Sequence, residues 1–139
     1  MGLFHSFDIS ASGMTAERLR MDVIANNLAN VNTTRTARGG PYRRQMVVFE
    51  ERLAQAMGKG RGRGAGVRVS RIVEDDDPPR LEYNPNHPDA DEQGYVALPN
   101  VNIVTEMVDM ISASRAYEAN IAALNAAKAM ALKALEIGR

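Results

Sequence analysis

The strongest constraint on the fold is a repeat in residues 103–137, where apolar or small side chains recur at alternating steps of four and three residues. This spacing places them along one side of an α-helix, as in a coiled coil. No proline or glycine interrupts the repeat, so it predicts a continuous rod of roughly 50 Å at about 1.5 Å per residue. The repeating residues are Ile103, Met107, Met110, Ser114, Tyr117, Ile121, Leu124, Lys128, Ala131 and Leu135.

The opposite side of this predicted helix is apolar as well. It carries Val104, Val108 and Ile111 and then a run of alanines, and no charged residue occurs between Glu118 and Lys128. A helix that is apolar on two sides needs neighbours on both sides, and alanine permits a close approach. We therefore expect a helix that becomes fully buried only within an assembly.

A second helix is expected near the N-terminus. It should begin near Asp8 or Ser10, either of which can cap a helix, and end near Val31. Gly13 inside it costs roughly 1 kcal/mol relative to alanine, so we expect its first turns to fray. This helix is also two-sided: one side carries Met14, Met21, Ile24, Leu28 and Val31, and the other carries Leu19, Val23, Asn26 and Asn30.

Between the helices the sequence favours strands and turns. β-Branched and other apolar residues predict strands at 45–50 and 67–73, and a short strand at 95–98. Pro85 and Pro88 exclude regular structure from the segment that contains them, because proline lacks the backbone donor and restricts the preceding residue.

These elements predict a mainly α fold: long N- and C-terminal helices packed as a coiled-coil-like pair, with a small β-hairpin and extended segment between them. Residues 1–33 and 100–139 together form the expected axial helical domain, and residues 34–99 form the β-hairpin and extended loop segment. The basic, glycine-rich stretch 58–66 is expected to be a mobile loop within that segment.

Charges are unevenly distributed along the chain. The 17 basic and 17 acidic residues balance overall. Residues 35–71, however, contain ten basic and two acidic residues, a net charge of +8, and residues 74–92 contain one basic and eight acidic residues, a net charge of −7. Such blocks suit either a head-to-tail contact between copies or two solvated loops of one chain that attract each other.

Residues that carry enzyme and metal chemistry are scarce. Cysteine is absent, which excludes disulfides and thiolate metal sites, and His5 and His87 are the only histidines. The acidic run 75–77 lacks the alternating ligands and glycine of a calcium loop. The basic loop has no aromatic residues and adjoins an acidic block, so it is poorly suited to nucleic acid. We expect no catalytic residue, no cofactor, no metal site and no nucleic-acid partner.

An asparagine-rich run at 26–32 is the least ordinary local sequence, with four asparagines in seven positions. Asparagine is a poor helix former because its amide competes for backbone hydrogen bonds. The run is either a frayed helix end or a set of amides that hydrogen-bond across helix interfaces and fix their register.

Several motifs resemble bacterial flagellar proteins. Residues 12–14 followed by 22–33 resemble the N-terminal signature of flagellar rod and hook proteins. The second half is similar to the FlgC family of proximal rod proteins, and the match runs from end to end. The segments that carry this similarity are NHPDADE at 86–92, GYV at 94–96, PNVN at 99–102, EMV at 106–108 and MISASRAYEAN at 110–120.

The resemblance implies a self-assembling structural subunit of the flagellar basal-body rod, the drive shaft that crosses the periplasm and transmits torque. It implies export by the flagellar type III apparatus without a cleaved signal, and no pattern of a cleaved signal is evident. The implied partners are other copies of the chain, other proximal rod proteins, the distal rod, and proteins at the MS-ring and export-gate junction. No apolar run reaches 18 residues, so no direct membrane span is expected.

The residues expected at subunit interfaces come from the two terminal helices. They are Met14, Met21, Ile24, Asn26, Asn27, Leu28, Asn30, Val31, Ile103, Met107, Met110, Tyr117, Ile121, Leu124, Ala131 and Leu135. The alternative function, from a different class, is a soluble coiled-coil adaptor or a nucleic-acid-binding dimer.

Overall fold

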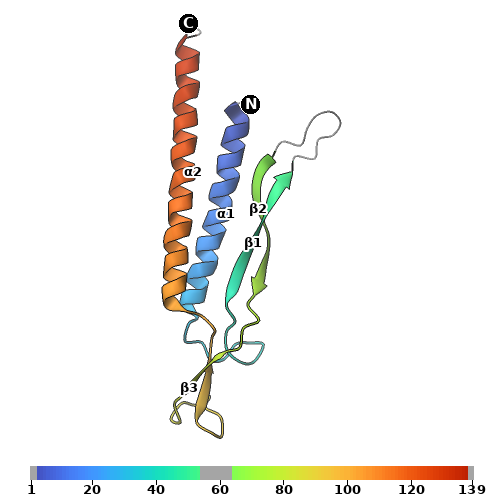
Figure 1. Cartoon of the computed structure of the whole chain (residues 1–139), viewed down its shortest axis with the longest axis vertical. Coiled ribbons are helices and arrows are strands. Elements are labelled where there is room, and N and C mark those ends of the chain that lie inside the picture. Colours follow the sequence, from blue (N-terminus) through green and yellow to red (C-terminus); the bar gives the residue numbers. More distant parts are fainter. Residues whose placement is uncertain (1–2, 54–63, 138–139) are drawn as a thin grey trace.

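The computed structural model of the chain describes residues 3–53 and 64–137. Within these residues it contains two long helices and a small antiparallel β region between them, which confirms the predicted layout (Figure 1). The elements are α1 (Leu3–Ala29), β1 (Gln45–Leu53), β2 (Gly64–Glu74), β3 (Arg80–Tyr83), β4 (Tyr95–Leu98) and α2 (Ile103–Ile137).

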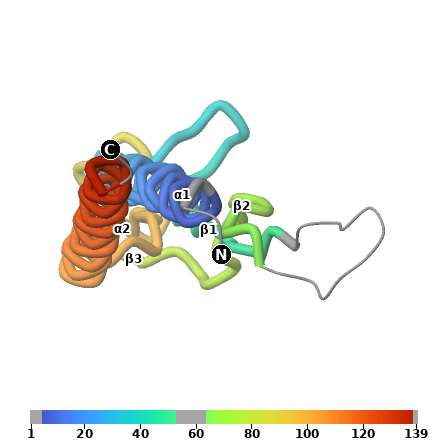
Figure 2. Tube along the Cα trace, turned by 90° about the horizontal axis from the view of Figure 1, so that it is seen from above, coloured from blue at the N-terminus to red at the C-terminus, as the bar shows by residue number. Residues whose placement is uncertain are grey.

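The helix α1 is the central layer of the molecule. It packs against α2 on one side and against the β1–β2 hairpin on the other (Figure 2). The two helices run antiparallel, with both termini at one end of the molecule and the β3–β4 hairpin at the opposite end (Figure 1). The two-sided pattern of α1 is thus satisfied within one chain.

The predicted start of α1 was wrong. The helix begins at Leu3 rather than near Asp8 or Ser10, so neither residue is its cap. It passes through Gly13 without a break. A Cβ at this buried glycine would lie 2.9 Å from Oδ1 of Asn120, so glycine is what lets the two helices approach closely here.

The β1–β2 hairpin extends both predicted strands. Its pairing is antiparallel, from Gln45 opposite Glu74 to Leu53 opposite Gly64. Residues 64–66 of the predicted loop therefore belong to a strand, and residues 58–63 lie outside the described residues.

A contact with α1 holds β2 in place. The backbone N–H of Val67 donates to Ser12 Oγ at 3.1 Å, and Ser12 donates to the carbonyl of Ile9 at 2.7 Å. Gly66 has a φ of 102°, and a Cβ on it would overlap Ser12 Oγ. A side chain at this position would separate the strand from the helix.

The β3–β4 hairpin was only half predicted. The strand β4 has the predicted bounds, but β3 was not expected, since its four residues are all exposed and carry no clear strand signal. Arg80 lies opposite Leu98, and Tyr83 lies opposite Tyr95. The proline-containing segment between the strands forms turns, as predicted.

The side of α2 that packs on α1 differs from the predicted repeat at every second position. The shared positions Met110, Tyr117, Leu124 and Ala131 are half-buried. The other contacting row is shifted by one residue and consists of Glu106, Ala113, Asn120 and Ala127. Of the bulky residues assigned to that row, Met107 is 55% exposed and Ile121 is 37% exposed.

The physical reason for this shift is side-chain size. Ala113 and Ala127 are 0% and 6% exposed, so the helices approach each other over small residues. A prediction from hydrophobicity assigns bulky residues to the contact between the helices and overlooks the alanines. It also cannot foresee that Glu106, which is 0% exposed, is buried with polar partners.

Candidate assembly interface

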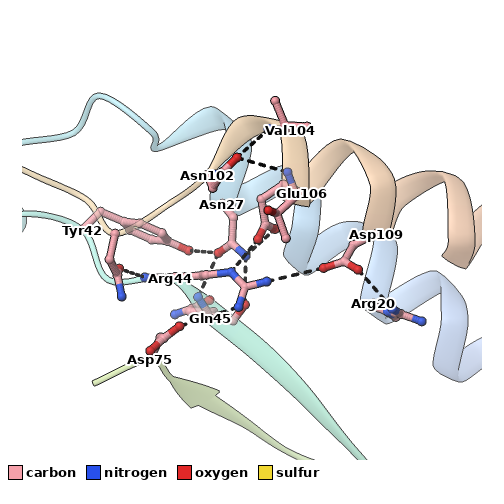
Figure 3. Close-up of polar contacts among 12 residues, drawn as sticks. Arg20, Asn27, Tyr42, Arg44, Gln45, Asp75, Asn102, Val104, Glu106 and Asp109 are labelled. Atoms are coloured by element: carbon pink, nitrogen blue, oxygen red, sulfur yellow. Dashed lines mark hydrogen bonds and ion pairs between the residues drawn. The ribbon is translucent and has the colours of Figure 1, made fainter. Parts of the chain in front are cut away.

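A buried polar cluster joins the ends of both helices to the start of β1. At its centre is Glu106, in the first turn of α2. Its Oε1 accepts a hydrogen bond from Arg44 Nε at 2.5 Å, and its Oε2 accepts one from Asn27 Nδ2 at 2.9 Å (Figure 3). A carboxylate out of contact with water requires such partners, because an unpaired buried charge is strongly destabilising.

Asn27 uses its whole amide within the chain. Besides its bond to Glu106, its Nδ2 donates to the carbonyl of Gln45 at 2.9 Å. Its Oδ1 accepts from the backbone N–H of Gln45 and from the hydroxyl of Tyr42, both at 2.9 Å. Two donors and two acceptor positions are thus satisfied, and the first residue of β1 is fixed against the end of α1.

Arg44 connects this cluster to further acidic groups. Its guanidinium lies 3.4 Å from Asp109 and 3.6 Å from Asp75. Burial lowers the pKa of Arg44, but its hydrogen bond to Glu106 and the neighbouring carboxylate charges outweigh this and raise the pKa. The arginine therefore stays charged. Arg20 of α1 adds a second link to α2, 3.7 Å from Asp109.

Asn26 and Asn30 behave differently from Asn27. Asn26 is exposed and donates to the Tyr42 hydroxyl at 3.2 Å, while Asn30 donates to the carbonyl and side chain of Asn26 at 2.9 and 3.1 Å. The second alternative therefore applies to Asn27, whose amide crosses to α2. Asn30 bonds within the end of α1, and Asn26 also contacts Tyr42 in the segment that follows the helix.

The start of α2 is capped by an asparagine that precedes it. Oδ1 of Asn102 accepts from the backbone N–H groups of Val104 at 2.9 Å and Thr105 at 3.2 Å (Figure 3). Such a cap satisfies two of the backbone donors that lack partners in the first turn. The cap fixes the first turn of α2, and Glu106 lies in that turn.

The predicted interface residues of α1 lie largely inside the chain. Ile24 is buried, and Met14, Met21, Leu28 and Val31 are half-buried. The sulfur of Met21 accepts a contact from Ser114 Oγ of α2 at 3.4 Å. These residues contribute to packing within the chain, and their contact with other subunits stays a prediction.

The predicted interface residues of α2 divide into two sets. Met110, Tyr117, Leu124 and Ala131 are half-buried beside α1. Four others are exposed to solvent; they are Ile103 at 49%, Met107 at 55%, Ile121 at 37% and Leu135 at 72%.

The exposed apolar surface of α2 is larger than the predicted set. We call it the outer face of α2. Besides the four exposed residues just given, it contains Val104, Val108, Ile111, Met130, Leu132 and Ile137, which are 53–86% exposed. Val104, Val108 and Ile111 lie on the side that the sequence predicted as a second apolar side. Met130, Leu132 and Ile137 were not predicted as part of it. Exposed apolar side chains in such number on one helix indicate an interaction site.

The oppositely charged blocks meet within the chain. Arg38 lies 2.9 Å from Glu74, and Arg43 lies 3.7 Å from Asp76. Arg44 and Asp75 form a third pair between the same blocks. These pairs favour the second alternative for this part of the blocks, two loops of one chain that attract each other.

Within residues 3–53 and 64–137, no group of three or more His, Cys, Asp or Glu side chains is arranged to hold a metal ion. In the same part of the chain, neither helix is apolar over enough of its length to cross a bilayer.

Comparison with known proteins finds matches that cover both helices. A family model described as flagella basal body rod protein matches residues 7–35, and one described as flagellar basal body rod FlgEFG protein C-terminal matches residues 92–137. A flagellar basal-body rod protein FlgC from Borreliella burgdorferi is 53% identical, over 99% of this chain and 98% of its own. The chain belongs to the FlgC family.

Other FlgC proteins agree over the full length. The protein of Bacillus subtilis is 47% identical and that of Salmonella typhimurium 44% identical, each over 100% of both chains. The resemblance to flagellar rod proteins is thereby confirmed. This FlgC-family chain is a structural subunit of the flagellar basal-body rod, and the two family models coincide with the regions of α1 and α2.

Proposed function

We propose that the chain builds the wall of the rod by burying the outer face of α2 against neighbouring subunits. The observation that carries this proposal is the contrast between an apolar outer face and a helix partner on only one side. Burying one leucine, isoleucine or valine side chain contributes roughly 1.5–3 kcal/mol. The apolar residues of this face together supply enough free energy to outweigh the entropic cost of association.

The burial pattern of α2 supports coiled-coil-like packing against a neighbouring subunit. The residues of α2 that contact α1 recur at steps of four and three, and directly beside them on the helix lie Ile103, Met107, Ile121 and Leu135. A helix from a second subunit that packed on this row would bury α2 on two sides, as the two-sided pattern requires. The other predicted interface residues would line the same contact or support it from α1.

The expected division into domains fits this assembly. Residues 1–33 and 100–139 form the axial helical domain in our proposal, and residues 34–99 form a second segment whose β1–β2 hairpin lies along α1. The buried cluster around Glu106 and the contact between Ser12 and Val67 attach this segment to α1. Torque would then pass through packed interfaces, with no bond chemistry, so the chain is not an enzyme.

The family relationship supports the finer location and partners. We infer a rod that crosses the periplasm, with subunits exported by the flagellar type III apparatus without a cleaved signal. The partners would be other copies, other proximal rod proteins, the distal rod, and proteins at the MS-ring and export-gate junction. The nucleic-acid alternative is weakened because Arg38, Arg43 and Arg44 are paired with acidic residues of the same chain.

The test replaces an outer-face residue by a charge. In a strain whose only copy carries Val108→Asp, we expect normal expression and no rods in isolated basal bodies. Val108→Leu, which keeps this exposed position apolar, is the matched control and should leave rods intact. Sedimentation separates the rival, since an adaptor forms a discrete dimer whereas a rod subunit is a monomer or an open polymer. Normal rods with Val108→Asp contradict the proposal.

A further inference from the structure

The β3–β4 hairpin presents a second apolar surface, far from the outer face of α2. Residues directly opposite each other in an antiparallel pair share a face, so Leu81, Tyr83, Tyr95 and Ala97 lie together. Leu81 and Tyr83 are each 65% exposed, and Tyr95 is 41% exposed. We call these four residues the hairpin face.

The hairpin face is held rigidly from behind. Val96, on the reverse side of β4, is only 3% exposed. The rings of Tyr83 and Tyr95 meet edge to face, with centroids 5.4 Å apart. A Cβ on Gly94, which has a φ of 84°, would lie 2.9 Å from Cε2 of Tyr83, so this ring packs on bare backbone. Exposed side chains that are already ordered lose little entropy on binding.

The surroundings of the hairpin face are acidic. The hairpin, residues 80–98, contains four acidic residues and one basic residue, Arg80, which lies 3.8 Å from Glu82. Glu92 is exposed, and Asp89 accepts a hydrogen bond from Thr34 at 2.8 Å. A surface that fits this hairpin should therefore combine an apolar floor with basic residues around it.

The same chain carries such a surface between α1 and the β1–β2 hairpin. It is a groove of about 630 Å³. Its floor includes Ala16, Leu19 and Val67, and the arginines around it are Arg18, Arg52 and Arg68. Asp22 is the acidic residue at its edge. Arg18 and Arg52 are exposed, and Arg68 is paired with Glu50 while 66% of its side chain stays exposed.

We propose that the hairpin face of one copy docks into this groove of the next copy along the rod. Tyr83 and Leu81 would contact the apolar floor, and the acidic residues around them would face the arginines. Arginine also binds favourably over tyrosine rings. The inference rests on the proposed rod function and adds the contact that joins successive copies.

The position of the two surfaces determines the kind of contact. The hairpin face lies at the end of the molecule opposite the termini, whereas the groove lies beside α1 and the β1–β2 hairpin (Figure 1). A contact between unlike surfaces at separated positions is head-to-tail and continues into an open filament. The groove is small for a stable dimer interface, so this contact would act together with the outer face of α2.

Cysteine cross-linking in assembled rods tests the docking, since the chain has no cysteine of its own. A chain with Glu92→Cys and Arg18→Cys places one thiol beside the hairpin face and one at the groove. Oxidation of isolated basal bodies should give a ladder of disulfide-linked multimers. Glu92→Cys with Ala37→Cys, an exposed position outside the groove, is the control. Equal ladders in both chains, or no ladder in rods that contain the first chain, overturn the inference.

Charge reversal provides an independent measurement that does not alter the hairpin strands. Arg18→Glu and Glu92→Arg should each lower the rod yield by roughly two- to fivefold, the range of an exposed ion pair. The two changes together should restore it. Arg35→Glu, an exposed arginine outside the groove, should have no effect. Yields equal to the parent for both single variants count against the docking.

Removal of apolar contacts should have a larger effect. Tyr83→Ser should lower the rod yield by roughly tenfold or more, because it removes the aromatic ring that would be buried against the floor of the groove. The proposed rod function is tested separately. If Val108→Asp abolishes rods while the hairpin and groove variants behave as the parent, the docking is wrong and the rod function stands. If Val108→Asp has no effect, the proposed burial of the outer face of α2 fails.

Discussion

The two helices share a sequence pattern, apolar residues on two sides, but they differ in how these sides are covered. Both are apolar on two sides, but α1 is covered by α2 on one side and by the β1–β2 hairpin on the other. The described part of α2 packs on α1 and leaves Val104, Val108 and Ile111 at 56–70% exposed. Apolar residues on two sides of a helix therefore predict two neighbours. The pattern does not say whether the second neighbour belongs to the same chain or, as we propose for α2, to another subunit.

The comparison extends to the kind of residue that each helix uses. The fully buried residues of α2 are small or polar: they are Ala113, Ala127 and Glu106. The half-buried Met110, Tyr117 and Leu124 contact α1 beside them. The large aliphatic residues of α2 lie mainly on the outer face. Much of the bulky apolar surface of α2 is thus exposed in the single chain, and small side chains lie at the closest approach of the two helices.

The largest expected effect is on the outer face. Deleting residues 132–139 removes Leu132, Leu135 and Ile137, which are 53%, 72% and 86% exposed. At roughly 2 kcal/mol for each buried side chain, assembly should be abolished. The free chain should keep its stability, because the C-terminal end of α2 extends past the start of α1 (Figure 1). Motility and rods in isolated basal bodies are the measurements, and a swimming strain contradicts this role of α2.

The second effect concerns the covered side. Glu106→Ala leaves Arg44 and Asn27 without their buried partner, and breaking such a pair costs about 3–5 kcal/mol. Denaturant unfolding of the isolated chain should show this loss, unlike the truncation. Glu118→Ala, at an exposed position of the same helix, is the control. A Glu106→Ala chain as stable as the parent would mean that the cluster does not stabilise the fold.

The truncation of α2 and Glu106→Ala concern features that differ in how far local sequence predicts them. The helices and the strands at 45–50 and 67–73 follow from local periodicity, and they were found. Glu106 was missed because its partner Arg44 is 62 residues away in the chain. Nothing local distinguishes Asn27, which is buried, from its neighbours Asn26 and Asn30.

The candidate interface was predictable in part for a similar reason. Periodicity identified which residues are apolar and on which helix, including Ile103 and Leu135. It could not decide which side of α2 packs against α1, because that depends on the close approach of Gly13 to Asn120. The strand β3 was missed because its pairing with β4, rather than its own burial, defines it.

A smaller effect tests the close approach of the helices. Alanine at position 13 favours a helix by roughly 1 kcal/mol, but its Cβ would lie 2.9 Å from Oδ1 of Asn120. Overpacking of this kind costs about 1–3 kcal/mol, so Gly13→Ala should lower the free energy of unfolding slightly. Combining it with Asn120→Ala should recover stability beyond additivity. Strictly additive values would show that the helices do not need glycine here.

The smallest effect is a pH dependence at the covered end of α1. Burial raises the pKa of Tyr42, with further contributions from the charges of Glu106 and Glu74, above the ordinary value of 10.0. A group whose pKa is raised in the folded state contributes stability below its unfolded pKa and loses it as the pH rises through the folded value. Thermal stability should therefore fall more steeply above about pH 10 in the parent than in Tyr42→Phe.

This pH dependence completes the comparison of the two helices. The ionised ring would face a buried carboxylate and lose its donated bond to Asn27, so the loss arises inside the chain. The outer face of α2 carries apolar residues that do not titrate, so apolar burial there adds no such dependence. Assembly of the Tyr42→Phe chain at neutral pH should match the parent, because the replaced hydroxyl lies away from that face. Identical pH profiles for the two chains would show that Tyr42 is not coupled to the cluster.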